Sequence, residues 1–219
     1  MELAARLNCL PIFPLPSVQL FPHAILPLHV FEPRYRELLQ DAMASDRRFA
    51  IAVLGDDYDP AEDGAGRRPA VRPVCGVGEV IAHEPLPDGR SNILLHGLAR
   101  VRILEELPQS HLYRTVRAVP LADRYPADVD LGPAQHALIA LSDQLAARLP
   151  EGGDTLRALV RSQPDPAALS DVLAATLVTD PRERQALLEN LDVSWRLESV
   201  MRAIAETLSR FADLRGPAN

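Results

Sequence analysis

A glutamate and an arginine flank a proline where a series of short apolar segments gives way to a helical pattern. Glu32-Pro33-Arg34 follows Phe31 and precedes Tyr35. A charged pair at such a position is suited to recognising a partner through ion pairs and hydrogen bonds. The alternative is structural: a carboxylate near a helix N-terminus is favoured by about 0.3–1 kcal/mol, and Arg34 then pairs with a carboxylate elsewhere in the domain. The motif predicts candidate binding residues at Phe31, Glu32, Arg34 and Tyr35.

Arginines on two adjacent predicted strands form the second candidate cluster: Arg100, Arg102, Arg114 and Arg117. Arg100 and Arg102 alternate with apolar residues and are expected on one face of a strand, where a basic stripe could bind RNA. The alternative is a solvated sheet face whose charge is offset by Glu105 and Glu106. Because no aromatic residues for base stacking are interleaved with the arginines, the sequence favours the solvated face.

The basic residues supply no catalytic amine. All 23 are arginine, and lysine is absent. P-loop ATPases, serine–lysine proteases and Schiff-base enzymes each depend on a lysine, so these activities are excluded within this chain. No Gly-x-Ser-x-Gly motif occurs, and no Ser, His and Asp can be assigned to a triad by local motif. We therefore expect no catalytic residues.

Residues that commonly bind metal ions are present without the spacing of a metal site. The six histidines form no His-x-x-x-His pair: His23, His29, His83, His96, His111 and His136. Asp56, Asp57 and Asp59 resemble the start of a calcium loop, but the glycine and glutamate positions do not follow. Cys9 and Cys75 lie in apolar segments and are expected as buried thiols in a reducing compartment. We therefore expect no metal ion and no cofactor.

The composition is that of an acidic globular protein with a sizeable core. The chain has 219 residues, is 47% hydrophobic and carries a net charge of −7, which fits one domain or a medium domain with a small one. The negative charge disfavours binding to nucleic acid or anionic membranes. Residues 1–6 lack a basic segment, and no apolar run approaches the roughly 20 residues of a membrane span. We expect a cytoplasmic protein with no membrane partner.

The first half, residues 1–122, alternates short apolar runs with turn signals and predicts a compact β-barrel or folded sheet with one early helix. The predicted strands are residues 10–13, 18–21, 25–31, 49–54, 74–86, 91–96, 98–107 and 111–121. Because proline cannot donate to a ladder, the prolines in and between the first strands indicate edges, bulges and corners. Pro33 opens the helix, and Pro87-Asp88-Gly89 predicts a hairpin turn. The polar segment 55–73 is expected to be mobile, with a functional loop as the alternative.

The second half, residues 123–219, predicts a bundle of helices with short connections. Apolar residues recur at helical spacing over residues 133–149 and 193–214. Asp165 and Asp180 are each followed by a proline, which pairs an N-cap with proline at the first helical position. Asp154 is expected to cap a shorter helix. Residues 1–122 and 123–219 are interpreted as two subdomains of one domain.

Two motifs in the first half carry a resemblance to a known family. The first runs from Leu10-Pro11-Ile12-Phe13-Pro14-Leu15 through Leu20-Phe21-Pro22 to Leu26-Pro27-Leu28-His29-Val30-Phe31-Glu32-Pro33-Arg34-Tyr35. The second is the Gly-x-x-Arg strand within His96-Gly97-Leu98-Ala99-Arg100-Val101-Arg102-Ile103. Over residues 8–212 the chain resembles the N-terminal substrate-recognition domain of Lon proteases. Residues 116–121 fall at the closing strand of that family, and residues 191–198 are similar to its C-terminal bundle.

The resemblance implies an α+β fold, a PUA-like β pseudo-barrel with one early helix, followed by an α-helical bundle. In Lon this region helps to recognise and hold unfolded or tagged substrates. The resemblance thus implies a non-catalytic module that binds unfolded or extended polypeptide segments, with an adaptor role in proteolysis or protein quality control. Since the sequence stops after the bundle, it resembles stand-alone bacterial proteins without the ATPase and protease parts. Because PUA-like folds often bind RNA, an RNA-binding protein using the arginine stripe is the alternative; a monomer and a weak dimer both remain open.

Overall fold

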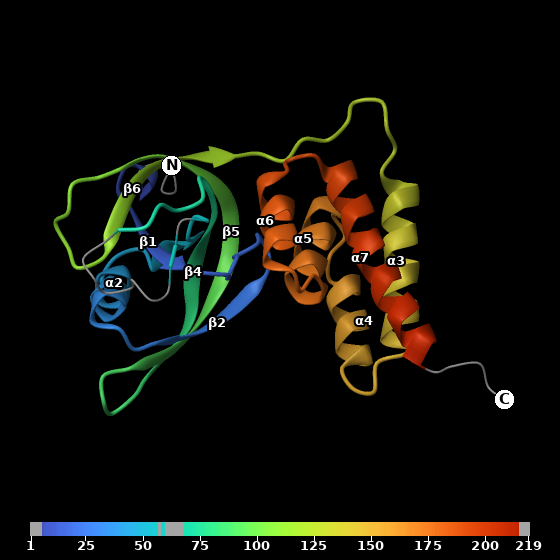
Figure 1. The fold of residues 1–219 in the computed structure, drawn as a ribbon, viewed down its shortest axis with the longest axis horizontal. Helices are drawn as coiled ribbons and strands as arrows, with labels where there is room; N and C mark the ends of the chain where they lie inside the picture. Colours follow the sequence, from blue (N-terminus) through green and yellow to red (C-terminus); the bar gives the residue numbers. More distant parts are fainter. Residues whose placement is uncertain (1–5, 57, 60–67, 215–219) are drawn as a thin grey trace. The chain divides into compact units, whose positions relative to one another are not determined.

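The computed structural model describes residues 6–56, 58–59 and 68–214. Contacts between Cα atoms divide the chain into two compact units, residues 1–122 and 123–219. The first unit contains the strands and one helix of three turns, and the second contains helices (Figure 1). The prediction that residues 55–73 are mobile falls in part on residues 57 and 60–67, which lie outside the described part of the chain.

The strands of the first unit form one sheet that closes on itself. The elements are η1 (Leu7–Cys9), β1 (Leu10–Leu15), β2 (Ile25–Val30), α2 (Pro33–Met43), β3 (Arg48–Val53), β4 (Val74–Pro85), β5 (Ser91–Glu106) and β6 (Arg114–Leu121). The strand order is β2-β5-β4-β3-β1-β6, and β5 also pairs with β6. Five strands therefore form a ring, and β2 extends it as an additional strand on β5. The predicted pseudo-barrel is confirmed.

The long strand β5 joins two runs that the sequence analysis treated as separate strands. Its first part pairs with β2 and its second part with β6, while β4 pairs along most of its length. Register shifts in the β4–β5 ladder at Val77/Gly78 and Val80/Ala82 let the strands bend as the ring closes. The turn predicted between β4 and β5 is confirmed, because Gly89 has φ +79° and Leu86 N donates to Arg90 O.

The segment between β1 and β2 packs across the sheet, in place of the strand predicted for residues 18–21. Leu20 and Phe21 are buried, and their carbonyl groups lie against glycines of the sheet. A Cβ atom on Gly76 would stand 1.8 Å from the Leu20 carbonyl oxygen, and one on Gly97 would stand 1.9 Å from the Phe21 carbonyl oxygen. The strand prediction is wrong because these apolar residues are buried by crossing over the sheet and do not pair with a strand. Only glycine, which has no Cβ atom, lets two backbones approach this closely.

The prolines of β1 depart from the expectation of edge strands, bulges and corners, which Pro27 in the edge strand β2 fulfils. β1 is an interior strand, parallel to β3 and antiparallel to β6. Its pairing with β6 ends at Ile12, and the Pro14 carbonyl accepts a hydrogen bond from Tyr35 Oη at 3.0 Å. The next carbonyl, that of Leu15, accepts from Leu54 N. The backbone of Pro14 thus faces away from β3, and proline at this position removes no ladder bond.

One face of α2 fills the interior of the ring. Tyr35, Leu38, Leu39 and Ala42 are buried in a cluster that also includes Phe13. The rings of Phe13 and Tyr35 stack with centroids 3.7 Å apart. Pro33 occupies the first turn of the helix, as predicted. This packing fixes the start of α2 against the end of β1.

Over its described residues, 123–214, the second unit contains five helices: α3 (Gly132–Ala146), α4 (Gly153–Arg161), α5 (Pro166–Leu177), α6 (Pro181–Glu189) and α7 (Val193–Leu214). The predicted caps are confirmed at two of them, since Asp165 accepts from Ala168 N and Asp180 accepts from Arg182 N and Glu183 N. Asp154 lies within the first turn of α4, and the cap residue is Gly152 with φ +80°. Helix α7 packs against α3 and α5.

A buried ion cluster in this unit was not predicted from the sequence. The Arg196 side chain on α7 is 1% exposed. Its Nη1 donates to Asp123 Oδ1 at 2.5 Å, and its Nε lies 3.7 Å from Asp171 Oδ1, which is also 1% exposed. The first residue of the second unit is thereby tied to its last helix.

Candidate functional site

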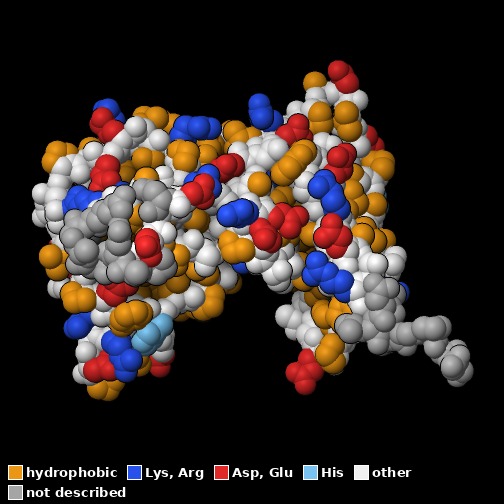
Figure 2. Space-filling view, viewed as in Figure 1, with side chains coloured by type: hydrophobic (Ala, Val, Ile, Leu, Met, Phe, Trp, Pro, Cys, Tyr) orange, Lys and Arg blue, Asp and Glu red, His pale blue; other side chains and the backbone are white. Residues whose placement is uncertain are grey.

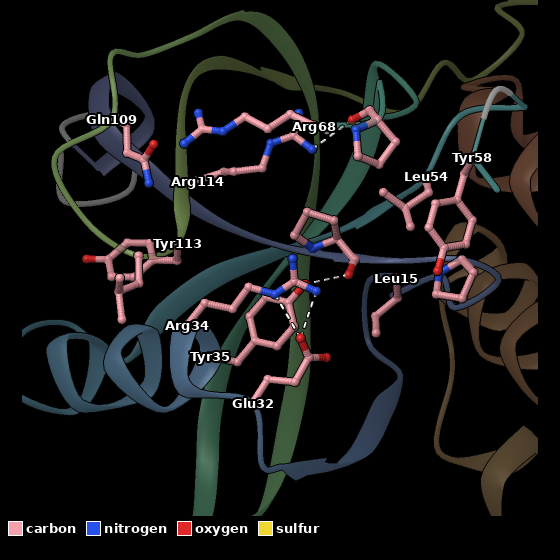
Figure 3. Close-up of a pocket in the computed structure, with 14 residues that line it drawn as sticks. Leu15, Glu32, Arg34, Tyr35, Leu54, Tyr58, Arg68, Gln109, Tyr113 and Arg114 are labelled. Atoms are coloured by element: carbon pink, nitrogen blue, oxygen red, sulfur yellow. Dashed lines mark hydrogen bonds and ion pairs between the residues drawn. The ribbon is translucent and has the colours of Figure 1, made fainter. Parts of the chain in front are cut away.

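The first unit contains a pocket of about 380 Å³ beside the end of β1 and the start of α2. Its apolar lining consists of Pro14, Leu15, Pro16, Leu54 and Leu112. In Figure 3, Leu15 and Leu54 lie on one side, and arginine, tyrosine and glutamine side chains lie across from them. A volume of this size falls in the ordinary range for ligand sites.

The Glu32–Arg34 pair lies on one side of the pocket. Arg34 Nη2 is 2.7 Å from Glu32 Oε2, and its guanidinium stands over the Tyr35 ring, 4.7 Å from the centroid (Figure 3). Glu32 is the cap residue of α2, but its side chain makes no capping bond with the described residues. Arg34 therefore pairs with its neighbour Glu32.

The Glu32–Arg34 pair is half exposed, with 43% of the Arg34 side chain and 36% of the Glu32 side chain accessible. Exposed ion pairs contribute about 0–1 kcal/mol to stability. The pair therefore contributes little to stability, while Glu32 and the Tyr35 ring orient the Arg34 guanidinium at the pocket.

A second guanidinium pair forms the opposite side. Arg114 contacts both carboxylate oxygens of Glu106, at 3.0 Å and 2.6 Å, and its Nη1 donates to Pro69 O at 2.9 Å. Arg68 Nη1 lies 3.4 Å from the same carboxylate. The bidentate geometry holds the Arg114 guanidinium in one orientation. The spacing of arginines along the strands predicts Arg114 only in a surface stripe.

The remaining predicted residues lie apart from the pocket. Phe31 is 58% exposed and its ring stacks on His29 with centroids 6.1 Å apart. Arg102 is exposed on β5, whereas Arg100 is 2% exposed. The expectation that Arg100 and Arg102 share a solvated face is wrong because Arg100 is covered in the fold.

The RNA-binding alternative is not supported. With Arg100 buried, the four arginines do not form one exposed stripe, and Arg117 is neutralised by Glu105 at 2.7 Å. On the face shown in Figure 2, arginine side chains are interspersed with acidic ones in both units. A surface of mixed charge offers no continuous track for a phosphate backbone.

Buried donors and thiols near the barrel are held in their neutral forms. Burial, followed by the hydrogen bond to Asp41, raises the pKa of Tyr113 above its usual range, so its phenol remains a donor at the edge of the pocket. Burial raises the pKa of Cys75 to about 12. Cys9 is exposed, so the prediction of two buried thiols is wrong for this residue, which lies in the short η1 helix rather than within a strand.

Several pocket residues come from connections that sequence periodicity could not assign. Tyr58 and Arg68 belong to the polar segment 55–73, and Gln109 and Leu112 to the connection between β5 and β6. Among the described residues that line the pocket there is no Ser, Thr, Cys or His. The pocket therefore offers apolar contact and hydrogen-bonding groups.

Solved structures show the fold that this chain shares. The chain aligns with the N-terminal domain of a Mycobacterium avium complex Lon protease with a TM-score of 0.66 and 18% identity, covering 90% of this chain and 98% of that one. It aligns with a Lon N-terminal domain protein from Xanthomonas campestris with a TM-score of 0.64 and 21% identity, covering 89% and 97%. At these identities the likeness shows the fold, which is that of Lon N-terminal domains.

The sequence comparison gives the family. A model described as the ATP-dependent protease La (LON) substrate-binding domain matches residues 9–206, and the chain belongs to this family. The Lon protease of Trichlorobacter lovleyi is 30% identical over 218 residues, which cover 95% of this chain and 26% of that protein. The Lon protease of Azorhizobium caulinodans is 26% identical over 201 residues, covering 91% and 23%. The chain thus spans about a quarter of the length of these relatives.

Proposed function

We propose that this chain is a non-catalytic module that binds unfolded or extended polypeptide segments in the pocket between Arg34 and Arg114. The observation that carries the proposal is an apolar wall facing two oriented guanidinium groups. An extended polypeptide presents apolar side chains alternating with backbone carbonyls. The wall suits the side chains, and the guanidinium groups and Gln109 suit the carbonyls. Membership of the Lon substrate-binding family supports the same ligand class.

Strand addition at β2 is a competing route for the same ligand. Among the described residues, β2 pairs with β5 alone, so its other edge is open. Pro27 lies in the middle of β2 and has no N–H to offer. Prolines on edge strands oppose pairing with further chains. This feature favours the pocket over the edge as the place where a segment is held.

A peptide titration with matched leucine variants tests the proposal. Leu112 is 59% exposed and lines the pocket, whereas Leu104 is 53% exposed on β5 and does not. With a fluorescent peptide derived from an unfolded model protein, Leu112→Ser should weaken binding about tenfold, or ~1.4 kcal/mol. Leu104→Ser should leave the affinity unchanged. No saturable binding to any unfolded protein or apolar peptide, or equal effects of the two changes, would count against the pocket.

The wider role that we propose is that of an adaptor in proteolysis or protein quality control, acting in the cytoplasm as a monomer or weak dimer. No helix in the described part of the chain is both long and apolar enough to cross a membrane. Cross-linking in cells, followed by identification of the captured proteins, tests the adaptor role. Captured unfolded substrates together with a protease would support it, and capture of neither would contradict it.

A further inference from the structure

Three side chains with metal-binding atoms meet outside the apolar pocket. Glu37 and Asp41 lie one turn apart on α2, and His111 lies in the connection between β5 and β6. His111 Nδ1 is 3.5 Å from Glu37 Oε1 and 3.7 Å from Asp41 Oδ2. One ligand atom from each of the three residues lies within 4.8 Å of the others. Sequence spacing could not reveal this group, because the histidine comes from a distant part of the chain.

We infer that Glu37, Asp41 and His111 form a binding site for a divalent cation of the zinc class. Two ligands placed 2.0–2.1 Å from Zn²⁺ at a tetrahedral angle are ~3.4 Å apart. The separations of 3.5 Å and 3.7 Å around His111 are close to that value. Small side-chain shifts therefore suffice for all three groups to contact one ion.

The donor set selects the type of cation. Imidazole nitrogen with carboxylate oxygens suits Zn²⁺ and similar transition metals, whereas Mg²⁺ and Ca²⁺ prefer oxygen ligands throughout. Two carboxylates and a neutral imidazole carry two negative charges, which a divalent ion neutralises. Side-chain exposures of 39% for His111, 31% for Glu37 and 45% for Asp41 leave room for water ligands.

Neighbouring donors hold the three side chains in place. Tyr113 Oη donates to Asp41 Oδ2 at 2.8 Å, and Leu112 N donates to Glu37 Oε1 at 3.2 Å. The His111 ring stacks on the Tyr113 ring, with centroids 4.7 Å apart and an interplanar angle of 11°. Such outer contacts orient metal ligands, and losing one commonly lowers metal affinity about 10- to 100-fold.

A bound cation would tie the connection between β5 and β6 to α2. Leu112 and Tyr113, which adjoin His111, also line the polypeptide pocket. The same ion would thus hold one wall of that pocket, although the site itself does not depend on what the pocket binds.

Calorimetric titration with Zn²⁺ and the visible absorption of Co²⁺ test the inference on the full chain. Cys9 is exposed and thiolate is a strong zinc ligand, so the titrations use a Cys9→Ser background without a histidine tag. The expected result is saturable binding of one ion per chain. His111→Ala should lower the affinity by more than about tenfold, while His136→Ala, a change of an exposed histidine on α3, should not.

Isosteric carboxylate changes keep the test valid if His111→Ala disturbs the connection. Asp41→Asn retains an acceptor for Tyr113 but loses the charge, and should also lower the affinity by more than about tenfold. Glu198→Gln, at an exposed position on α7, is the matched control. Absence of saturable binding at millimolar Zn²⁺ or Co²⁺, or binding that all four variants retain equally, would overturn the site.

Discussion

The two units of the chain both use arginine–carboxylate pairs, but at opposite extremes of exposure. Arg196 is 1% exposed between Asp123 and Asp171, whereas the Arg34 side chain is 43% exposed beside Glu32. The Arg114 side chain has an intermediate exposure of 14%. Because the free energy of an ion pair depends on how far its charges are removed from water, the pair at Arg196 should matter much more for stability than the pair at Arg34.

The largest effect is expected at the buried cluster. Arg196→Ala leaves the Asp171 carboxylate, 1% exposed, without its nearby guanidinium, and should lower the free energy of unfolding of the second unit by about 3–5 kcal/mol. Arg202→Ala, at an exposed position on the same helix, should change it by less than ~0.5 kcal/mol. Urea denaturation followed by circular dichroism measures both. Similar small changes for the two variants would remove the contrast between the units.

An intermediate effect is expected at Arg114. Arg114→Gln removes the bidentate contact with Glu106 and the bond to Pro69 O, and should lower the free energy of unfolding of the first unit by about 1–2 kcal/mol. Arg117→Gln, which removes the exposed pair with Glu105, serves as the control and should cost less than ~0.5 kcal/mol. If the control were as damaging as Arg114→Gln, exposure would not be the factor that ranks these pairs.

The smallest effect on stability is expected at Arg34. Arg34→Gln should change the free energy of unfolding by less than ~1 kcal/mol, yet lower peptide affinity about tenfold, since its guanidinium lies in the pocket. Raising the salt concentration should reduce the contribution of this exposed pair much more than that of Arg196. A variant that melts early and binds normally would show that Arg34 is structural.

A tyrosine in the second unit makes the stability of that unit depend on pH. Partial desolvation of this half-exposed side chain, followed by the hydrogen bond to Asp165, raises the pKa of Tyr125 to about 12. Since the folded-state pKa is above the unfolded value of about 10, the stabilisation is complete below pH ~10 and is lost as pH rises toward 12. Tyr125→Phe should flatten this part of the stability profile, as measured by denaturation across that range. A profile identical to that of the unmodified chain would contradict the assignment.

Local patterns predicted the features that depend on neighbours in the sequence. The Asp-Pro starts of α5 and α6, the Pro33 start of α2 and the turn at Gly89 follow from backbone preferences of single residues. The family resemblance over the first half was likewise carried by contiguous motifs, and the match to residues 9–206 confirms it.

The features that the sequence did not predict depend on how the strands pair and on where one segment crosses the sheet. Arg114 meets Glu106 because β5 and β6 pair, and Arg100 is buried although its alternation with apolar residues suggested solvent. Residues 18–21 have strand-like composition but pass over Gly76 and Gly97. The pocket and the Glu37–Asp41–His111 group combine residues from separate connections, and no spacing within one segment specifies such a meeting.

The unequal burial of the two cysteines has a practical consequence. Cys9 is exposed, while the Cys75 thiol is buried with its pKa raised to about 12. Reagents that react with thiolates will therefore modify the folded protein only at Cys9. A dye or spin label can thus be attached next to the first strand without engineering the chain, and later uptake of reagent by Cys75 would report opening of the barrel.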